Sequence, residues 1–170
     1  MKIPIKAIED MIEEIAGKEA VQVYKLLKGK ENINEFVIAN KLKLTINQLR
    51  NIIYKFEHYN LISSSRKKDR KKGWYIYFFT FNDRQADEVV VQLFKDKINL
   101  LQKQLEREKN HQFYTCPNRC VRLTIENAME NQFLCSECGS LLAAEDNEKN
   151  IQKIKARMDA LNKELNKLTK

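Results

Sequence analysis

The chain has 170 residues and a formal net charge of +8, with 43% apolar and 32% charged residues. This length suits one domain or two small ones joined by a helix, and so much charge excludes a membrane protein. The positive balance predicts an acidic partner, either nucleic acid or an acidic protein face. The N-terminal "MKIPIKAIEDMIEEIAGK" carries four acids where a signal peptide needs an apolar stretch, so we expect a cytoplasmic protein.

Four short amphipathic helices are predicted in the first sixty residues. One apolar stripe stops at Gly17 and a second ends at Gly29. Asn34 is the expected N-cap of "EFVIANKL", and Thr45 with Gln48 forms a capping-box pattern before "INQLRNIIYKFEHY". The last two helices, separated by a brief turn, have the spacing of a helix-turn-helix, in which the second helix is presented to a partner.

A β-hairpin is predicted next, because "NLISSS" and "GWYIYFFTF" are short β-branched or aromatic segments. Helix, helix-turn-helix and hairpin is the order of a winged helix, which we place at residues 1–83. Residues 66–72 would form the wing tip, and Trp74 would begin the returning strand. One face of that strand should cover the core, and the other is a candidate surface. The candidate contact residues are Arg66, Lys67, Lys68, Arg70, Lys71, Lys72, Trp74, Tyr75 and Tyr77.

Positive charge is concentrated on this wing rather than on the presented helix. That helix offers polar but only mildly basic side chains, namely Asn47, Gln48, Arg50, Asn51, Tyr54 and Lys55. Lysine and arginine on a loop neutralise phosphates without reporting base identity, and neighbouring aromatics suit single-stranded or distorted DNA. We therefore expect sequence-independent contact, against the alternative of a solvated loop that touches nothing.

Two long helices are predicted around a small unit at residues 112–146. In the linker, residues 84–111, apolar positions from Val91 to Leu105 are spaced three and four apart, and residues 147–170 repeat the pattern. We expect the two segments to pair in antiparallel fashion. The alternative is coiled packing without a functional role.

All four cysteines lie between the two long helices, as Cys116, Cys120, Cys135 and Cys138. The pairs enclose three and two residues and are separated by fourteen, which is the spacing of two knuckles around one tetrahedral zinc ion. A closed shell of four thiolates indicates a structural site, with Gly139 supplying a permissive backbone. A redox-active pair or disulfides are the alternatives, which a cytoplasmic compartment disfavours.

No enzyme is indicated. The histidines His58 and His111 stand in no metal-ligand or nucleophile arrangement, and the four glycines form no phosphate-binding loop. The fold class predicted is mainly α with small β: a winged helix-turn-helix, a long helical linker, and a zinc ribbon closed by a heptad-patterned helix.

The wing with "GWYIYFF", followed by a helical linker and "CPNRCVRLTIENAMENQFLCSECGSLL", resembles archaeal transcription factor E. That family is the counterpart of the N-terminal half of the eukaryotic general factor IIE alpha subunit. The zinc segment and "GWYIY" are the most specific parts of the resemblance, which covers nearly the whole chain. The first knuckle departs from it, because three residues separate its cysteines where a zinc ribbon more usually has two.

The resemblance implies a basal initiation factor that binds the clamp and stalk of RNA polymerase and helps to melt promoter DNA. It implies contact with the non-template strand by the wing, four cysteine ligands for zinc, and an initiation complex with TATA-binding protein and transcription factor B. A monomer without membrane contact is expected. The rival hypotheses are a sequence-specific winged-helix regulator, which would be a dimer on a palindromic site, and a protein-only assembly module.

Overall fold

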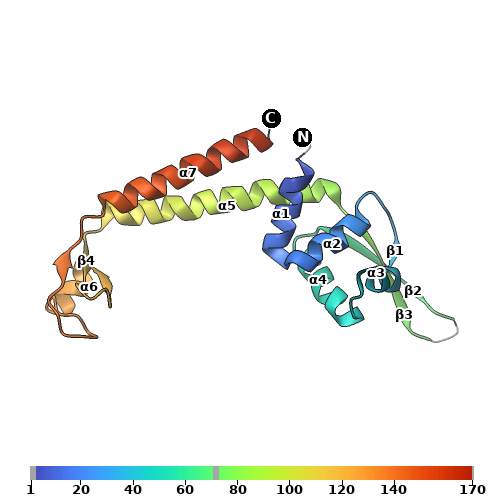
Figure 1. Cartoon of the computed structure of the whole chain (residues 1–170), viewed down its shortest axis with the longest axis horizontal. Helices are drawn as coiled ribbons and strands as arrows, with labels where there is room; N and C mark the ends of the chain where they lie inside the picture. Colours follow the sequence, from blue (N-terminus) through green and yellow to red (C-terminus); the bar gives the residue numbers. More distant parts are fainter. Residues whose placement is uncertain (1–2, 71–72, 170) are drawn as a thin grey trace. The chain divides into compact units, whose positions relative to one another are not determined.

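A computed structural model describes residues 3–70 and 73–169 of the chain. The chain divides into two compact units, one made mainly of residues 1–93 and the other of residues 94–167. The described residues are mainly helical and include two small three-stranded sheets (Figure 1). Helix α5 (Asp83–Asn110) contributes residues to both units.

The four predicted N-terminal helices are confirmed. They are α1 (Ile5–Ala16), α2 (Lys18–Leu27), α3 (Glu35–Leu42) and α4 (Ile46–His58). Both predicted caps form: the Asn34 side chain accepts the Phe36 N–H at 2.8 Å, and Thr45 Oγ1 accepts the Gln48 N–H at 3.2 Å. Gln48 Oε1 in turn accepts the Thr45 N–H at 2.9 Å, which completes the capping box.

A three-stranded antiparallel sheet completes the first unit. Its strands are β1 (Ile33–Asn34), β2 (Ile62–Lys68) and β3 (Tyr75–Phe81), in the order β1-β3-β2. The order of helices and strands is consistent with a winged helix. The two-residue strand β1 was not predicted, because so short a segment shows no alternation that could mark it.

The core of the first unit packs the sheet against the helices. Phe79 and Phe81 are the buried residues of β3, and the Phe81 ring lies 4.8 Å from the Tyr24 ring and 5.9 Å from the Phe56 ring. Both partner rings are fully buried. Aromatic rings at these separations add an edge-to-face attraction to the apolar burial, so α2, α4 and β3 share one core.

The wing differs from its prediction at its base. Arg66, Lys67 and Lys68 are not in the loop but in strand β2, where they pair with residues 77, 76 and 75 of β3. The chain reverses after Asp69, whose N–H donates to the Trp74 carbonyl at 2.8 Å. Strand β3 begins one residue later than expected, at Tyr75.

In the second unit a small sheet is formed by the part of the chain that links two long helices. The sheet, in the order β5-β4-β6, consists of β4 (Phe113–Thr115), β5 (Arg122–Thr124) and β6 (Ala143–Ala144), and α6 (Ile125–Glu130) follows β5. Helix α7 (Glu148–Leu168) follows β6. The Asn147 side-chain amide donates to the Glu108 carbonyl, which ties the start of α7 to the end of α5. Within the described residues, no helix combines the length and apolar character needed to cross a membrane.

Candidate nucleic-acid interface and metal centre

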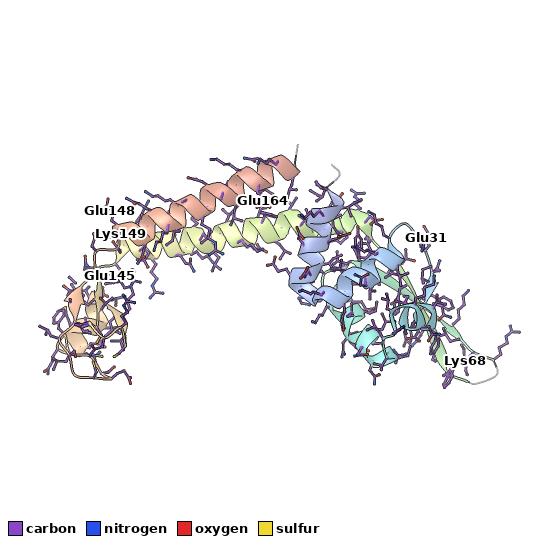
Figure 2. The ribbon with its side chains drawn as sticks, viewed as in Figure 1. Glu31, Lys68, Glu145, Glu148, Lys149 and Glu164 are labelled. Atoms are coloured by element: carbon purple, nitrogen blue, oxygen red, sulfur yellow. The ribbon has the colours of Figure 1, made fainter. Side chains whose placement is uncertain are left out.

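The β2–β3 hairpin presents cations beside aromatic rings. Arg66, Lys67 and Lys68 are all exposed, and Lys68 lies near the far end of the hairpin (Figure 2). The Arg66 guanidinium lies 4.7 Å from the centre of the Tyr75 ring, and Lys67 Nζ lies 5.4 Å from that of Phe78. These are cation–π distances, so each cation is held along the strand with its charge open to solvent.

The three predicted contact aromatics differ in exposure. Trp74 and Tyr75 are exposed by 51% and 47%. Tyr77 is half-buried. Its ring stacks on the Phe79 ring with the two centroids 6.5 Å apart, and the Arg50 guanidinium carbon lies 5.4 Å from the centre of the Tyr77 ring. Arg70 is exposed in the turn, while Lys71 and Lys72 lie outside the described residues. Trp74 and Tyr75 are therefore the ring systems accessible to a partner.

An ion pair between a buried carboxylate and a partly exposed arginine links the presented helix to the wing. Glu35, at the first position of α3, is 0% exposed, and its carboxylate accepts hydrogen bonds from Arg50 Nε at 3.1 Å and Nη2 at 3.0 Å. The Tyr77 N–H of β3 donates to the same carboxylate at 3.2 Å. One carboxylate thus joins α3, α4 and β3. The pair was not predicted from the sequence, since an acid in a first helical turn usually faces solvent.

This pair also changes what helix α4 can offer to DNA. Arg50 is committed to Glu35, and Gln48 to the capping box. Tyr54 is 61% exposed, and Asn47, Asn51 and Lys55 remain exposed on the helix. The helix therefore keeps amide groups for base contact but loses the arginine that most often reads guanine.

The four cysteines come together at one point of the second unit. Their sulfur atoms all lie within 4.8 Å of one another, and Cys116 Sγ lies 3.4 Å from Cys138 Sγ. A tetrahedral ion with metal–sulfur bonds of about 2.3 Å needs sulfur atoms about 3.8 Å apart. The donor set and its spacing therefore fit one metal ion, and no disulfide joins any of the four.

Each cysteine pair sits in a tight turn that aims both sulfurs at this point. In the second turn the Gly139 N–H donates to the Cys135 carbonyl at 2.8 Å, and Gly139 has φ 71°, as predicted for a permissive backbone. In the first turn the Arg119 N–H donates to the Cys116 carbonyl at 2.8 Å, with φ 58° at Arg119. The longer first knuckle therefore closes with a non-glycine residue in the left-handed region.

The thiols differ in acidity. The pKa of Cys138 is lowered to about 5, because Ser140 and the Asn118 side chain form hydrogen bonds that favour the thiolate. The pKa of Cys120 is raised to about 12, chiefly by its hydrogen bond with Cys138. The environment of Cys138 thus favours its thiolate, and the thiolate is the form of cysteine that binds a metal ion.

An arginine two residues beyond the first knuckle joins the metal-centre segment to helix α5. Arg122 Nη1 and Nη2 donate to the two carboxylate oxygens of Glu108 at 2.9 and 2.8 Å, and Nε donates to Glu145. Its guanidinium also lies 3.7 Å from the centre of the buried Phe113 ring. This cluster was not predicted from the sequence, because no local pattern relates Glu108, Arg122 and Glu145.

Comparison with known proteins gives consistent matches over most of the chain. The family model described as TFIIE alpha subunit matches residues 6–110. A protein named Transcription factor E from Metallosphaera sedula is 30% identical over 164 residues, covering 96% of this chain and 93% of the relative. One of the same name from Methanococcus maripaludis is 30% identical over 159 residues, covering 94% and 89%. A solved structure, "Possible transcriptional regulator from Methanosarcina mazei Go1", aligns with a TM-score of 0.45 and 19% identity, covering 57% of this chain and 87% of that one.

Proposed function

This chain belongs to the TFIIE alpha subunit family of general transcription initiation factors, and from that premise we propose that it stabilises the open promoter complex of RNA polymerase. It is a transcription factor and not an enzyme. In the proposal it contacts the clamp and stalk of the polymerase in the cytoplasm, in an initiation complex with TATA-binding protein and transcription factor B. The chain acts there as a monomer.

The observation that carries the proposal is the combination of open cations and open aromatics on the β2–β3 hairpin. Arg66, Lys67 and Lys68 neutralise backbone phosphates whatever the base sequence. Trp74 and Tyr75 present exposed rings to unpaired bases, which would stack on Tyr75 from the face that Arg66 does not cover. A melted non-template strand offers both phosphates and unpaired bases, whereas a straight duplex keeps its bases stacked.

The metal centre is proposed to be a structural zinc ribbon. Zinc prefers four thiolates in a tetrahedron, and Cys116, Cys120, Cys135 and Cys138 supply that set without leaving a position for water or substrate. The bound ion would fix the two knuckles and the small β5-β4-β6 sheet that adjoins them. Purified protein that contains no zinc and whose thiols are free without loss of structure would contradict this assignment.

Helices α5 and α7 are proposed to close as an antiparallel pair beside the metal centre. Between residues 152 and 167 of α7, all positions are exposed except four half-buried ones, which are the predicted apolar positions Ile154, Met158, Leu161 and Leu165. In α5, Leu101 is 8% exposed. Pairing within one chain would leave these seams covered in a monomer. Analytical ultracentrifugation tests it: an obligate dimer held by the two helices would mean that pairing occurs between subunits.

The mechanism proposed is differential binding. A factor that binds the melted strand and the open polymerase better than the closed complex shifts the equilibrium toward opening without ATP. A coupling free energy of about 1 to 3 kcal/mol is typical of such linkage, and it corresponds to roughly a 5- to 150-fold change in the opening equilibrium.

A promoter-melting assay with purified polymerase tests the function. We expect added protein to increase the melted fraction at a weak promoter, and the triple variant Arg66→Ala, Lys67→Ala, Lys68→Ala to lose most of the increase. The control variant Lys149→Ala, Lys153→Ala, Lys155→Ala removes the same charge from exposed positions of α7 and should retain the increase. No increase with the unaltered protein would overturn the proposal.

A second variant separates the rival functions. In a sequence-specific regulator the determinants lie on the presented helix, so Asn47→Ala with Asn51→Ala would abolish binding to a duplex site and wing neutralisation would weaken it uniformly. In a protein-only assembly module neither change would affect promoter melting. We expect the wing variant to have the larger effect on melting.

A further inference from the structure

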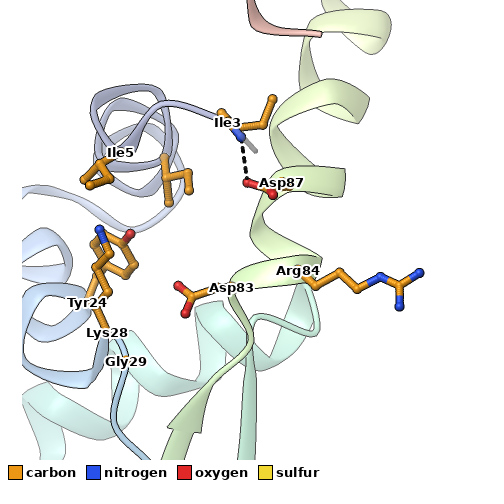
Figure 3. Close-up of a pocket in the computed structure, with 9 residues that line it drawn as sticks. Ile3, Ile5, Tyr24, Lys28, Gly29, Asp83, Arg84 and Asp87 are labelled. Carbon is orange, nitrogen blue, oxygen red and sulfur yellow. Dashed lines mark hydrogen bonds between the residues drawn. The ribbon is translucent and has the colours of Figure 1, made fainter. Parts of the chain in front are cut away.

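The first unit contains a cavity of about 680 Å³ between the N-terminal segment, α2 and the first turns of α5. Ile3, Ile5 and Ile8 form an apolar wall. Figure 3 shows Tyr24 on one side of the space and the carboxylates of Asp83 and Asp87 on the other. This volume is within the range of sites that hold small ligands, and the lining combines apolar surface with a few convergent polar groups.

The floor of this Tyr24 cavity carries a polar group that lacks a partner. Tyr24 is 0% exposed, and its ring is held 4.8 Å from Phe81. Among the buried side-chain polar atoms of residues 3–70 and 73–169, its hydroxyl oxygen has no hydrogen-bond partner. Buried hydroxyls are nearly always paired in folded proteins, so the Tyr24 hydroxyl points to a ligand group that the cavity is shaped to receive.

The charges around that hydroxyl are negative. Burial, and then the charges of Asp83, Glu9 and Asp87, raise the pKa of Tyr24 to about 12. Asp83 makes no hydrogen bond or ion pair with another described residue, whereas Asp87 accepts the Ile3 N–H at 3.3 Å and Glu9 pairs with Lys25 at 3.4 Å. A carboxylate without a partner beside an unpartnered hydroxyl favours a cationic hydrogen-bond donor over an anion.

Two cations, Lys28 and Arg84, also line the cavity. Lys28 Nζ lies 5.8 Å from the centre of the Tyr24 ring, over its face, and Arg84 pairs with Glu88 at 3.8 Å. In Figure 3 the Arg84 side chain extends away from the space between Tyr24 and Asp83. Among the described residues, neither cation forms a hydrogen bond or ion pair with the Tyr24 hydroxyl or the Asp83 carboxylate.

We propose that the Tyr24 cavity binds a primary ammonium group carried on a short aliphatic chain. The ammonium donates to the Tyr24 hydroxyl oxygen and to the Asp83 carboxylate, and its third N–H is directed to Asp87. The aliphatic chain packs against Ile5 and Ile8. A guanidinium fits less well, because its planar fork of donors does not converge on a single point. The same chemistry is presented by a free alkylamine and by a lysine side chain of a partner protein.

Titration of the full-length protein with n-hexylammonium, followed by NMR, tests the proposal. We expect n-hexylammonium to cause amide shifts that cluster at residues 24 and 83–87. The neutral probe n-hexanol, which has the same chain length, should bind at least tenfold more weakly. Nα-acetyl-lysine methylamide forms the second arm: binding of both amines indicates a lysine side chain as the natural ligand, and binding of n-hexylammonium alone indicates a free amine. Absence of clustered shifts with either amine overturns the proposal.

Three variants locate the site. Tyr24→Phe removes only the hydroxyl, and Asp83→Asn removes the charge; each should weaken n-hexylammonium binding roughly tenfold or more. Asp10→Asn makes the same charge change at an exposed position of α1 outside the lining and should bind as the unaltered protein does. Thermal unfolding verifies that each variant is folded. Equal binding of hexanol and hexylammonium, or unchanged binding by folded Asp83→Asn, overturns the proposal.

Discussion

In the first unit large apolar and aromatic side chains from α1, α2, α3, α4 and the sheet are buried together, including Tyr24, Phe56 and Leu27. In the second unit the cluster at the metal centre has four buried members, and two of them are Cys116 and Cys135. The first unit thus excludes water with apolar surface, whereas the proposed zinc ribbon of residues 112–146 would depend on the ion that its thiols bind. The two units should therefore lose their structure by different routes.

Removal of the metal should give the largest effect. Structural zinc contributes about 10 to 16 kcal/mol of apparent binding free energy in small zinc-dependent units, so a chelator should unfold residues 112–146. NMR amide spectra would measure this, with the signals of the first unit expected to persist. Cys135→Ser should reproduce the loss without chelator, whereas Ser136→Ala, at the exposed neighbouring position, should not. Acidification should act in the same direction, since protons compete for the thiolates.

Truncation in the first unit's core tests the other half of the comparison. Phe56 is 0% exposed, so Phe56→Ala should reduce the free energy of unfolding by about 3 to 5 kcal/mol. Denaturant titration measures this loss, and the zinc content of the protein should not change. Tyr54→Ala, on the same helix at a residue exposed by 61%, should cost less than about 0.5 kcal/mol. Loss of zinc from the Phe56 variant would show that the units are not independent.

Breaking the Glu35–Arg50 ion pair tests how much a charge interaction contributes to the stability of the first unit. Arg50→Met leaves the Glu35 carboxylate buried without its cation, which should cost about 3 kcal/mol. Adding Glu35→Gln should restore part of this, because the neutral amide oxygen still accepts the Tyr77 N–H. Lys55→Met on the exposed side of α4 is the matched control and should have little effect. A double variant no more stable than Arg50→Met would contradict the assigned role of the pair.

The smallest expected effect concerns the Tyr24 hydroxyl. The folded state raises the pKa of Tyr24 from 10.0 to about 12, so it holds the phenol proton more tightly than the unfolded chain does. The resulting stabilisation is complete below pH 10 and is lost as the pH rises to about 12. The loss should amount to about 2 to 3 kcal/mol.

Denaturant titrations of the unaltered protein and of Tyr24→Phe over this pH range isolate the effect, because other groups titrate equally in both. The two proteins should differ most in their pH dependence above pH 10. Tyr54→Phe, at an exposed tyrosine, should follow the unaltered protein. Parallel curves for all three proteins would mean that Tyr24 is not the group responsible.

Local patterns predicted the helical part of the fold well. Apolar spacing and the caps at Asn34 and Thr45 act within a few residues, so they can be read directly from the sequence. Strand β2 shows the limit: from Ser63 to Lys68 every residue is exposed, so no alternation marked Arg66, Lys67 and Lys68 as strand. Its extent is set by pairing with the aromatic strand β3.

The candidate site was predictable where residues lie close together and not where distant ones meet. The spacing of the cysteines identified all four members of the sulfur cluster. The Glu35–Arg50 pair and the Glu108–Arg122 pair join residues 15 and 14 positions apart in different elements, and no periodicity links them. Tertiary packing likewise decides that Trp74 and Tyr75 are exposed whereas the Tyr77 ring is partly covered by Arg50.

The Glu35 carboxylate has a consequence for how related chains can change during evolution. An acid sealed under an arginine and a strand N–H cannot be exchanged alone, since each single replacement leaves a charge or an N–H without its counterpart. Viable lineages must therefore alter positions 35 and 50 together or keep both. Among homologues, this constraint should produce covariation between positions 35 and 50. That covariation should be stronger than the covariation between either position and its neighbours in the chain.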